Sequence, residues 1–270
     1  MQLTQAQIAQ YDRDGFLHFP EFFSAAEVEA MRREVSRISN IDSEMVVREG
    51  TQNVPKVMFR MHESDGATAS PVFHAAVRLP RTLGMAQQLL RDSDLYLHHT
   101  KVNIKAAIEG SIWPWHQDYG SWFNDGIQRP TMLTMMVGLD ASKEMNGCLY
   151  FIPGTHMIGR VDPYFDTSTA YKVWSLTPTD MKRIIGEYGE PVAITGKPGS
   201  LTVFDCNLVH ASGHNLSAQD RWQAYFCYNT VGNRPKDVDK PRPDYVRSRN
   251  WKPLETVADD AITKHALANA

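Results

Sequence analysis

The stretch LYLHHTKVNI, residues 95–104, marks a change in the hydrophobic pattern of this 270-residue chain. From here on, short segments rich in β-branched and aromatic residues follow one another, which is typical of β-strands. Turn signals such as Asn146-Gly147 and Pro198-Gly199 separate them. The predicted strands are 95–104, 131–139, 148–152, 192–195, 200–204 and 222–229. Because regular helices do not alternate with these strands, the pattern favours an antiparallel sandwich or barrel over a parallel sheet.

The chain before residue 95 has a mostly helical pattern. Residues 4–14 are helix-forming, and Ser24 with Glu27 forms a capping box ahead of an amphipathic segment. A further helical stretch, 71–91, is interrupted at Pro80. These segments predict helices that pack on the outside of the β-structure.

Two features complete the organisation of the chain. Thr177 as N-cap and Pro178 at the first helical position predict one helix within the strand region, to about residue 188. The tail from Gly232 is rich in Pro, Lys, Arg and Asp, which predicts an extended surface segment that ends in a short helix. We therefore expect one domain over residues 1–270, mainly β with flanking helices.

Charge and composition limit the classes of function. The chain carries 28 Lys and Arg against 31 Asp and Glu, a net charge of −3, which offers no general attraction to nucleic acid or an anionic membrane. No stretch approaches the roughly 18 to 20 apolar residues of a membrane span, and no signal peptide is recognisable. The three cysteines cannot all pair, as expected in a reducing compartment. We expect a cytoplasmic monomer or homodimer whose partner is a small-molecule substrate, with no nucleic-acid or membrane partner.

The segment WPWHQDYGSW, residues 113–122, contains a candidate metal-binding pair. On a strand, residues two apart project to the same face, so His116 and Asp118 could converge on one point. His210 follows a later predicted strand. Two histidines and one carboxylate form the facial triad that holds non-haem Fe(II) with open coordination positions. The H-x-D pair alone also arises by chance, and then the residues are only hydrogen-bonded or at the surface.

Arg221 opens the apolar strand that follows His210. A buried guanidinium needs a partner, because a lone buried charge is costly. Its planar, bidentate geometry suits a carboxylate. The partner is either a carboxylate ligand or an internal Asp or Glu.

Taken together, these motifs resemble the phytanoyl-CoA dioxygenase superfamily of Fe(II)/2-oxoglutarate-dependent oxygenases, and within it the ectoine hydroxylase-like enzymes. The similarity covers most of the chain. It is carried, in order, by YDRDGF (11–16), WHQD (115–118), NGCLYFIPGTH (146–156), PGS (198–200), His210 and Arg221. The resemblance implies a double-stranded β-helix, or jelly-roll, cupin-like core at 93–230, with a mostly helical part at 1–92 and a tail at 231–270.

The resemblance also implies roles for individual residues. The Fe(II) ligands, which are the catalytic residues, would be His116, Asp118 and His210. The 2-oxoglutarate co-substrate would be held by Arg221, Ser212, Asn103, Trp113 and His99. Substrate contacts would include Trp122, to which we add Tyr119 and Lys105 as candidates. Halogenating relatives lack the carboxylate ligand, so Asp118 implies transfer of oxygen from O2.

Strand parity and loop positions leave several points open. If the strand at 95–104 is regular, at most one of His98 and His99 faces inward, and parity with Asn103 selects His99. Lys101 and Lys105 share that parity, and each either binds an anionic substrate group or lies at a solvated rim. The loops at 45–66 and 159–171, together with the tail, are candidates to close over the site.

The leading functional prediction is a hydroxylase of a small polar, amino-acid-like molecule that releases succinate and CO2. A second hypothesis keeps the cofactors but changes the outcome to desaturation, epoxidation or cyclisation. A third, of another class, is a zinc hydrolase with the same triad, which leaves Arg221 and Asn103 without a role. A non-catalytic cupin-like binding module would have little need of a complete triad.

Overall fold

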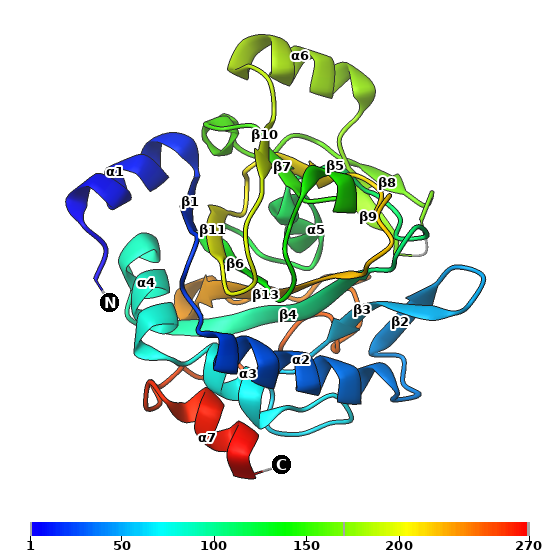
Figure 1. The fold of residues 1–270 in the computed structure, drawn as a ribbon. Helices are drawn as coiled ribbons and strands as arrows, with labels where there is room; N and C mark the ends of the chain where they lie inside the picture. Colours follow the sequence, from blue (N-terminus) through cyan, green and yellow to red (C-terminus); the bar gives the residue numbers. More distant parts are fainter. Residues whose placement is uncertain (1, 170, 269–270) are drawn as a thin grey trace.

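A computed structural model describes residues 2–169 and 171–268 of the chain. Its centre is a large antiparallel sheet that faces a smaller antiparallel sheet (Figure 1). The seven strands of the larger sheet are, in spatial order, β1 (Phe16–Phe19), β11 (Leu201–Asp205), β6 (Met132–Gly138), β13 (Arg221–Thr230), β4 (Leu95–Lys105), β3 (Val54–Phe59) and β2 (Val46–Glu49). The smaller sheet contains β10 (Val192–Ile194), β7 (Leu149–Phe151), β12 (His210–Ser212) and β5 (Trp113–His116). This arrangement is the double-stranded β-helix that the sequence predicts.

Aromatic and aliphatic side chains fill the space between the two sheets. Met136, Phe204 and Tyr225 of the larger sheet pack against Leu149 and Phe151 of the smaller one. A third, two-stranded sheet lies beside the smaller sheet and consists of β8 (Tyr164–Asp166) and β9 (Val173–Ser175). This apolar packing reaches the site described below, because Phe151 and Phe204 contact His210.

Most of the helices pack on the opposite face of the larger sheet, whereas the helix at 178–188 packs beside the smaller sheet (Figure 1). The described helices are α1 (Gln5–Asp14), α2 (Ala25–Ser39), α3 (Pro71–Ala76), α4 (Pro80–Leu90), α5 (Asp118–Asn124), α6 (Pro178–Tyr188) and α7 (Ala261–Ala268), with short 3₁₀ turns at Glu144–Asn146, Thr155–Ile158 and Val231–Asn233. Capping boxes begin α1 at Thr4 and α2 at Ser24, and each satisfies backbone N–H groups that a helix start leaves free. None of the described helices has the length and apolar character needed to cross a membrane.

The expected strands and helices occur close to their predicted bounds, but several elements were not predicted. The segment 46–59, expected as a loop, forms the β2–β3 hairpin, whose turn has positive φ at Gly50 and Asn53. The aromatic run 16–19 is strand β1, paired with β11, and it interrupts the helical part. β1, β2 and β3 thus join the same sheet as the later strands. These strands are four to six residues long, which is too short for an alternating hydrophobic pattern to be recognised.

The tail is more than a surface segment. Val246, Arg247 and Ser248 are buried, and the backbone N–H of Ser248 donates to the carbonyl of His98 on β4, at 2.7 Å. The predicted final helix is α7, which packs against α2 and α3 and buries Ile262. Residues 269–270 lie outside the described part of the chain.

Candidate active site

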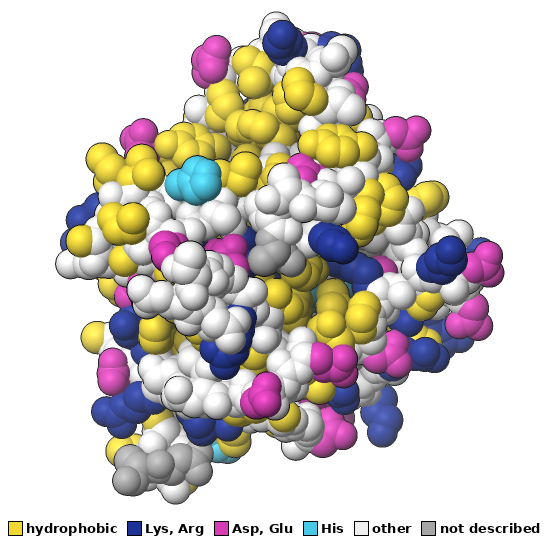
Figure 2. Space-filling model, turned by 90° about the vertical axis from the view of Figure 1, so that its right-hand side faces the viewer, with side chains coloured by type: hydrophobic (Ala, Val, Ile, Leu, Met, Phe, Trp, Pro, Cys, Tyr) yellow, Lys and Arg dark blue, Asp and Glu magenta, His cyan; other side chains and the backbone are white. Residues whose placement is uncertain are grey.

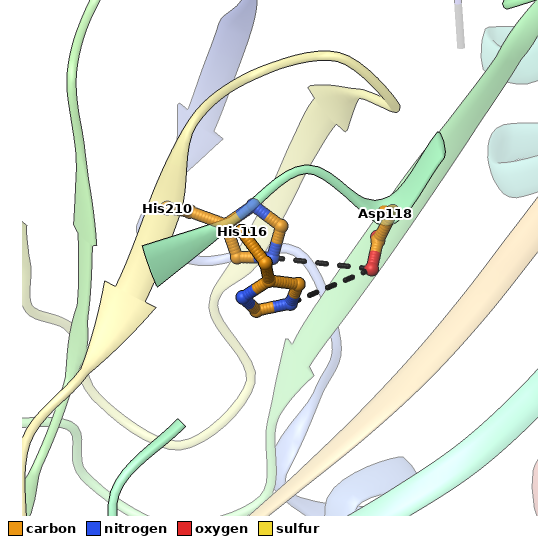
Figure 3. Close-up of side chains that lie close together, drawn as sticks. All are labelled: His116, Asp118 and His210. Atoms are coloured by element: carbon orange, nitrogen blue, oxygen red, sulfur yellow. Dashed lines mark ion pairs between the residues drawn. The ribbon is translucent and has the colours of Figure 1, made fainter. Parts of the chain in front are cut away.

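His116 and His210 lie directly opposite each other on paired strands. His116 ends β5, His210 begins β12, and the two are register partners, with ring centroids 4.1 Å apart. Asp118 points at both rings from the start of α5, as Figure 3 shows. Its Oδ1 lies 3.8 Å from Nε2 of His116 and 4.0 Å from Nε2 of His210. The structure therefore brings the predicted triad together.

The local structure that positions Asp118 differs from the predicted one. The prediction placed His116 and Asp118 on one face of a continuous strand, and this is wrong because β5 ends at His116 and α5 begins at Asp118. The turn of the chain between them directs the carboxylate back over the end of the strand. The two-residue spacing identified the pair correctly, although the strand predicted to carry both residues was wrong.

Both imidazoles are held in the tautomer that a metal ligand requires. Nδ1 of His116 donates to the carbonyl of Pro114 at 2.7 Å, and Nδ1 of His210 donates to the carbonyl of Leu208 at 2.9 Å. Burial lowers the pKa of His116 to about 3, with a further contribution from His210. Burial also lowers the pKa of His210. Each ring is thus neutral at pH 7, and each offers its Nε2 lone pair.

The donor set fits a divalent metal ion. The ligand atoms of His116, Asp118 and His210 all lie within 4.8 Å of one another. Both Oδ1–Nε2 distances are shorter than the ~4.2 Å that two metal–ligand bonds of about 2.1 Å can span. Burial would raise the pKa of Asp118, but His210 and Lys101 outweigh this and lower it, so the carboxylate is charged. Two imidazoles and one carboxylate are the facial ligand set of non-haem iron.

Arg221, on β13, is buried without an acidic partner among the described residues. Its side chain is among the largest that are fully enclosed, with 1% of the residue exposed. One Nη donates to the carbonyl of Gly147 at 2.8 Å and the other to Oε1 of Gln223, while Nε has no partner. The alternative of an internal salt bridge is therefore not realised. A buried guanidinium with a free N–H donor can pair with the carboxylate of a bound ligand.

Two more predicted co-substrate residues present unsatisfied polar atoms nearby. Oγ of Ser212 and Oδ1 of Asn103 are buried and have no hydrogen-bond partner in the described structure. Asn103 is the register partner of Gln223, which lies two residues after Arg221 on β13. Buried polar groups are normally satisfied, so a cluster of unsatisfied ones marks a place for a polar ligand.

Trp113 and Lys105 border the same end of the site. Trp113 pairs with Ser212 across β5 and β12. Lys105 is register partner of Arg221, and its ammonium donates to the main-chain carbonyls of Ser111, at 2.7 Å, and Gly213. Burial and the charge of Arg221 lower the pKa of Lys105 to about 6. Lys105 therefore lies at the co-substrate end of the site, and it is buried rather than at a solvated rim.

Both histidines of the pair at 98 and 99 are buried, as are ten of the eleven residues of β4. The register between β4 and β13 shifts between Cys227 and Tyr228, opposite this pair. His98 packs edge-on against Trp122, at 5.7 Å between ring centroids, and His99 packs against Phe59 at 5.4 Å. A β-bulge breaks the alternation of side chains, so parity could not choose between the two rings. Nδ1 of His99 donates to the carbonyl of Val246 in the tail.

The two aromatic substrate candidates of α5 are packed into a small apolar cluster. Tyr119 and Trp122 are buried together with Ile127 and Met132. The hydroxyl of Tyr119 donates to the carbonyl of Ile127 at 3.3 Å. Trp122 also packs against His98.

The structure adds wall residues that the sequence did not reveal. Tyr171 packs against Trp113, at 5.2 Å between centroids, and against Phe59 at 5.7 Å. Arg242, from the tail, lies within 3.4 Å of the Tyr171 hydroxyl and forms a close ion pair with Asp125, at 2.6 Å. Tyr171 lies within the segment 159–171, of which residue 170 is outside the described part. Phe59, Tyr171 and Arg242 bring 45–66, 159–171 and the tail into contact with one another, and closure of these segments over the site stays a prediction.

Lys101 was left open between substrate binding and a solvated rim. Its ammonium lies over the ring of Trp113 at 4.8 Å and over that of Tyr225 at 5.2 Å. Among the described residues it has no carboxylate or hydrogen-bond partner. Figure 2 shows the face of the molecule that carries β2, β3, β8 and β9. On this face, hydrophobic side chains surround a hollow that has Lys or Arg at its edge.

Comparison with known proteins agrees with this geometry. The family model of phytanoyl-CoA dioxygenase matches residues 11–222. An ectoine dioxygenase from Nocardia farcinica is 32% identical over 92% of this chain and 86% of its own length. An L-proline trans-4-hydroxylase from Streptomyces griseoviridis is 32% identical over 94% of this chain and 96% of its own. Among solved structures, EctD from S. alaskensis with 2-oxoglutarate and 5-hydroxyectoine has a TM-score of 0.81 at 30% identity, and the match covers 95% of this chain and 88% of that one.

Proposed function

The chain belongs to the phytanoyl-CoA dioxygenase family, and from this premise we propose that it is an Fe(II)- and 2-oxoglutarate-dependent hydroxylase of a small amino-acid-like molecule. Membership of the family makes it a dioxygenase. The substrate class is our inference from the site. His116, Asp118 and His210 would hold the iron, and Arg221, with Ser212 and Asn103, would hold 2-oxoglutarate.

One observation carries the proposal: the same jelly roll holds a metal-ligand triad and a buried guanidinium, Arg221, that has no acidic partner among the described residues. A dicarboxylate with a 2-oxo group satisfies both, because one end can chelate a metal and the other can pair with Arg221. A zinc hydrolase has no use for this second charge. The carboxylate of Asp118, which halogenating relatives lack, supports oxygen transfer over halogenation.

The residues of this chain have defined tasks in such a reaction. The bound iron and co-substrate supply the oxidising chemistry, in which 2-oxoglutarate and O2 give succinate, CO2 and a hydroxylated product. Pro114 and Leu208 carbonyls fix the two imidazoles so that Nε2 of each faces the metal. Trp113 and Tyr225 are buried and flank Lys101 with their rings, which would help to exclude water. The protein contributes geometry and a dry cavity.

Side chains beside Trp113 and Tyr171 support an amino-acid-like substrate. Among the residues that the structure describes, the Lys101 ammonium has no anionic partner, which suits a substrate carboxylate. His99, predicted above to contact 2-oxoglutarate, uses Nδ1–H on the Val246 carbonyl, and we assign its Nε2, which is then an acceptor, to an N–H donor of the substrate instead. Phe59 and Tyr171 provide apolar surface for a short carbon skeleton. The relatives named above act on ectoine and L-proline, which share this combination of a carboxylate and a ring nitrogen.

The experiment is a screen of succinate formation with Fe(II), ascorbate and 2-oxoglutarate. The panel contains L-proline, other cyclic imino acids, ectoine and linear amino acids, each beside its carboxamide. We expect one or more of the acids to increase succinate formation and to gain one oxygen atom by mass spectrometry. A product lacking two hydrogens instead would favour the desaturation alternative. Absence of Fe(II)-dependent succinate formation with every compound would contradict the proposal.

A further inference from the structure

Thr134 lies beneath the metal-facing carboxylate. It is a residue of β6 with no exposed surface, and its Oγ1 is 3.0 Å from Oδ2 of Asp118. Strand β6 is paired on both sides, and Thr134 is register partner of Phe204 on β11 and of Cys227 on β13. Its backbone is therefore held from two directions, and a β-branched side chain has few rotamers to choose from.

The direction of the hydrogen bonds follows from chemistry. A carboxylate only accepts, so the hydroxyl of Thr134 donates to Asp118. Oγ1 of Thr134 is also 3.3 Å from Sγ of Cys227, and with its own proton engaged the hydroxyl accepts there. Burial raises the pKa of the Cys227 thiol to about 12, which keeps the proton on sulfur for this bond. The chain of donors thus runs from Cys227 to Thr134 to Asp118.

The two oxygens of Asp118 have different surroundings. Oδ1 faces the imidazoles of His116 and His210, whereas Oδ2 faces Thr134. The neighbourhood on the Thr134 side is apolar and includes Trp122 and Met132. The other buried thiol there, Cys206, donates to the carbonyl of Pro130 at 3.3 Å instead. Thr134 is therefore the side chain that fixes which oxygen of Asp118 turns toward the metal.

We propose that Thr134, supported by Cys227, is a positioning residue of the metal centre that makes Asp118 present a single oxygen to the ion. The inference rests on the proposed function, because it concerns the same metal. With Oδ2 engaged, Asp118 occupies one coordination position instead of two, which leaves room for a chelating co-substrate and O2. Groups that orient metal ligands in this way raise metal affinity by roughly 10- to 100-fold.

The test is the affinity of the metal-free protein for Mn(II), measured by isothermal titration. Thr134→Val replaces the hydroxyl by a methyl group of similar size, and we expect Mn(II) to bind at least ~10-fold more weakly. Thr134→Ser restores the donor, and we expect its affinity within about threefold of that of the original protein. Cys227→Ala should give a smaller loss than Thr134→Val, because it removes only the support of the hydroxyl.

Thr202→Val is the matched control. Thr202 is equally buried in the neighbouring strand β11, but its hydroxyl contacts His18, outside the site. Circular dichroism establishes that each variant is folded, and Thr134→Ala replaces Thr134→Val if the latter is not. Equal Mn(II) affinity of Thr134→Val and the original protein, or weak Mn(II) binding by Thr134→Ser, would overturn this inference but not the proposed function. No Mn(II) binding by the original protein would overturn the proposed function as well.

Discussion

His116 and His210 are register partners on two antiparallel strands, and their rings are 4.1 Å apart. The pairing of β5 with β12 therefore brings together ligands that are 94 residues apart in the sequence, and hydrogen bonds to main-chain carbonyls turn each Nε2 toward Asp118. The metal site is thus built into the sheet, and its parts can be tested one at a time.

Removal of one imidazole should abolish metal binding without unfolding the protein. In His116→Ala two ligands remain, and we expect Mn(II) affinity to fall by more than about 100-fold, beyond the loss caused by disturbing a group that merely orients a ligand. Isothermal titration measures this. His156→Ala is the control, since His156 is half-buried and contacts the carbonyl of Asp12 instead. Equal losses in both variants would show that the effect is not specific to the triad.

Arg221→Met should weaken 2-oxoglutarate binding while leaving Mn(II) binding intact. Loss of one partner of a buried charge pair costs 2 kcal/mol or more, which is roughly a 30-fold rise in Kd. In thermal unfolding, 2-oxoglutarate at about 100 times its Kd stabilises the original protein by ~2.7 kcal/mol. We expect most of this gain to disappear in the variant. Arg183→Met, on the exposed face of α6, should keep it. An unchanged gain in Arg221→Met would refute the role of Arg221.

The ion pair between the tail and α5 should contribute to stability. Arg242 donates to both oxygens of the buried Asp125, through its backbone N–H, Nε and Nη2. Arg242→Met leaves that carboxylate unpaired, and we expect the free energy of unfolding to fall by about 2 to 4 kcal/mol, less than the full cost because the arginine side chain is 26% exposed. Urea denaturation measures the change. The double variant with Asp125→Asn should recover part of the loss, and additive losses would contradict the prediction.

Asp205 should make stability depend on pH. Burial raises its pKa to about 7, so the folded protein holds this proton more tightly than the unfolded chain. The contribution is full below about pH 4 and is lost as the pH rises through about 7, with a slope of up to ~1.4 kcal/mol per unit. Asp205→Asn keeps an acceptor for the backbone N–H of Asn207 and should remove this part of the decline. The exposed Asp162→Asn serves as control. Parallel pH profiles of Asp205→Asn and the original protein would contradict the assignment.

The strands and the triad could be predicted because their signals are local or rely on distinctive residue types. The long strands β4 and β13 show sustained β-branched and aromatic content, and the pair His116 and Asp118 with His210 is a recognisable ligand set. The double-stranded β-helix followed from the strand pattern together with the family resemblance.

The rest depends on long-range packing. The bulge opposite Cys227 cannot be recognised from one strand alone, yet it breaks the alternation of side chains at His98 and His99. The wall contributed by Tyr171 and Arg242 depends on the path of a loop and a tail that lack periodic patterns. The contact of Thr134 with Asp118 arises only because β6 passes beneath the first turn of α5. No residue spacing in the sequence predicts this contact.

The most direct test of the account is the affinity for 2-oxoglutarate with and without metal. The triad and Arg221 form one site for the two ends of this molecule, so titration of 2-oxoglutarate should show binding at least ~10-fold tighter in the Mn(II)-loaded protein than in the metal-free protein, a coupling of about 1.4 kcal/mol or more. The coupling should be absent in His116→Ala. Equal affinity with and without Mn(II), or no binding in either state, would contradict the claim that these residues form a single metal and 2-oxoglutarate site.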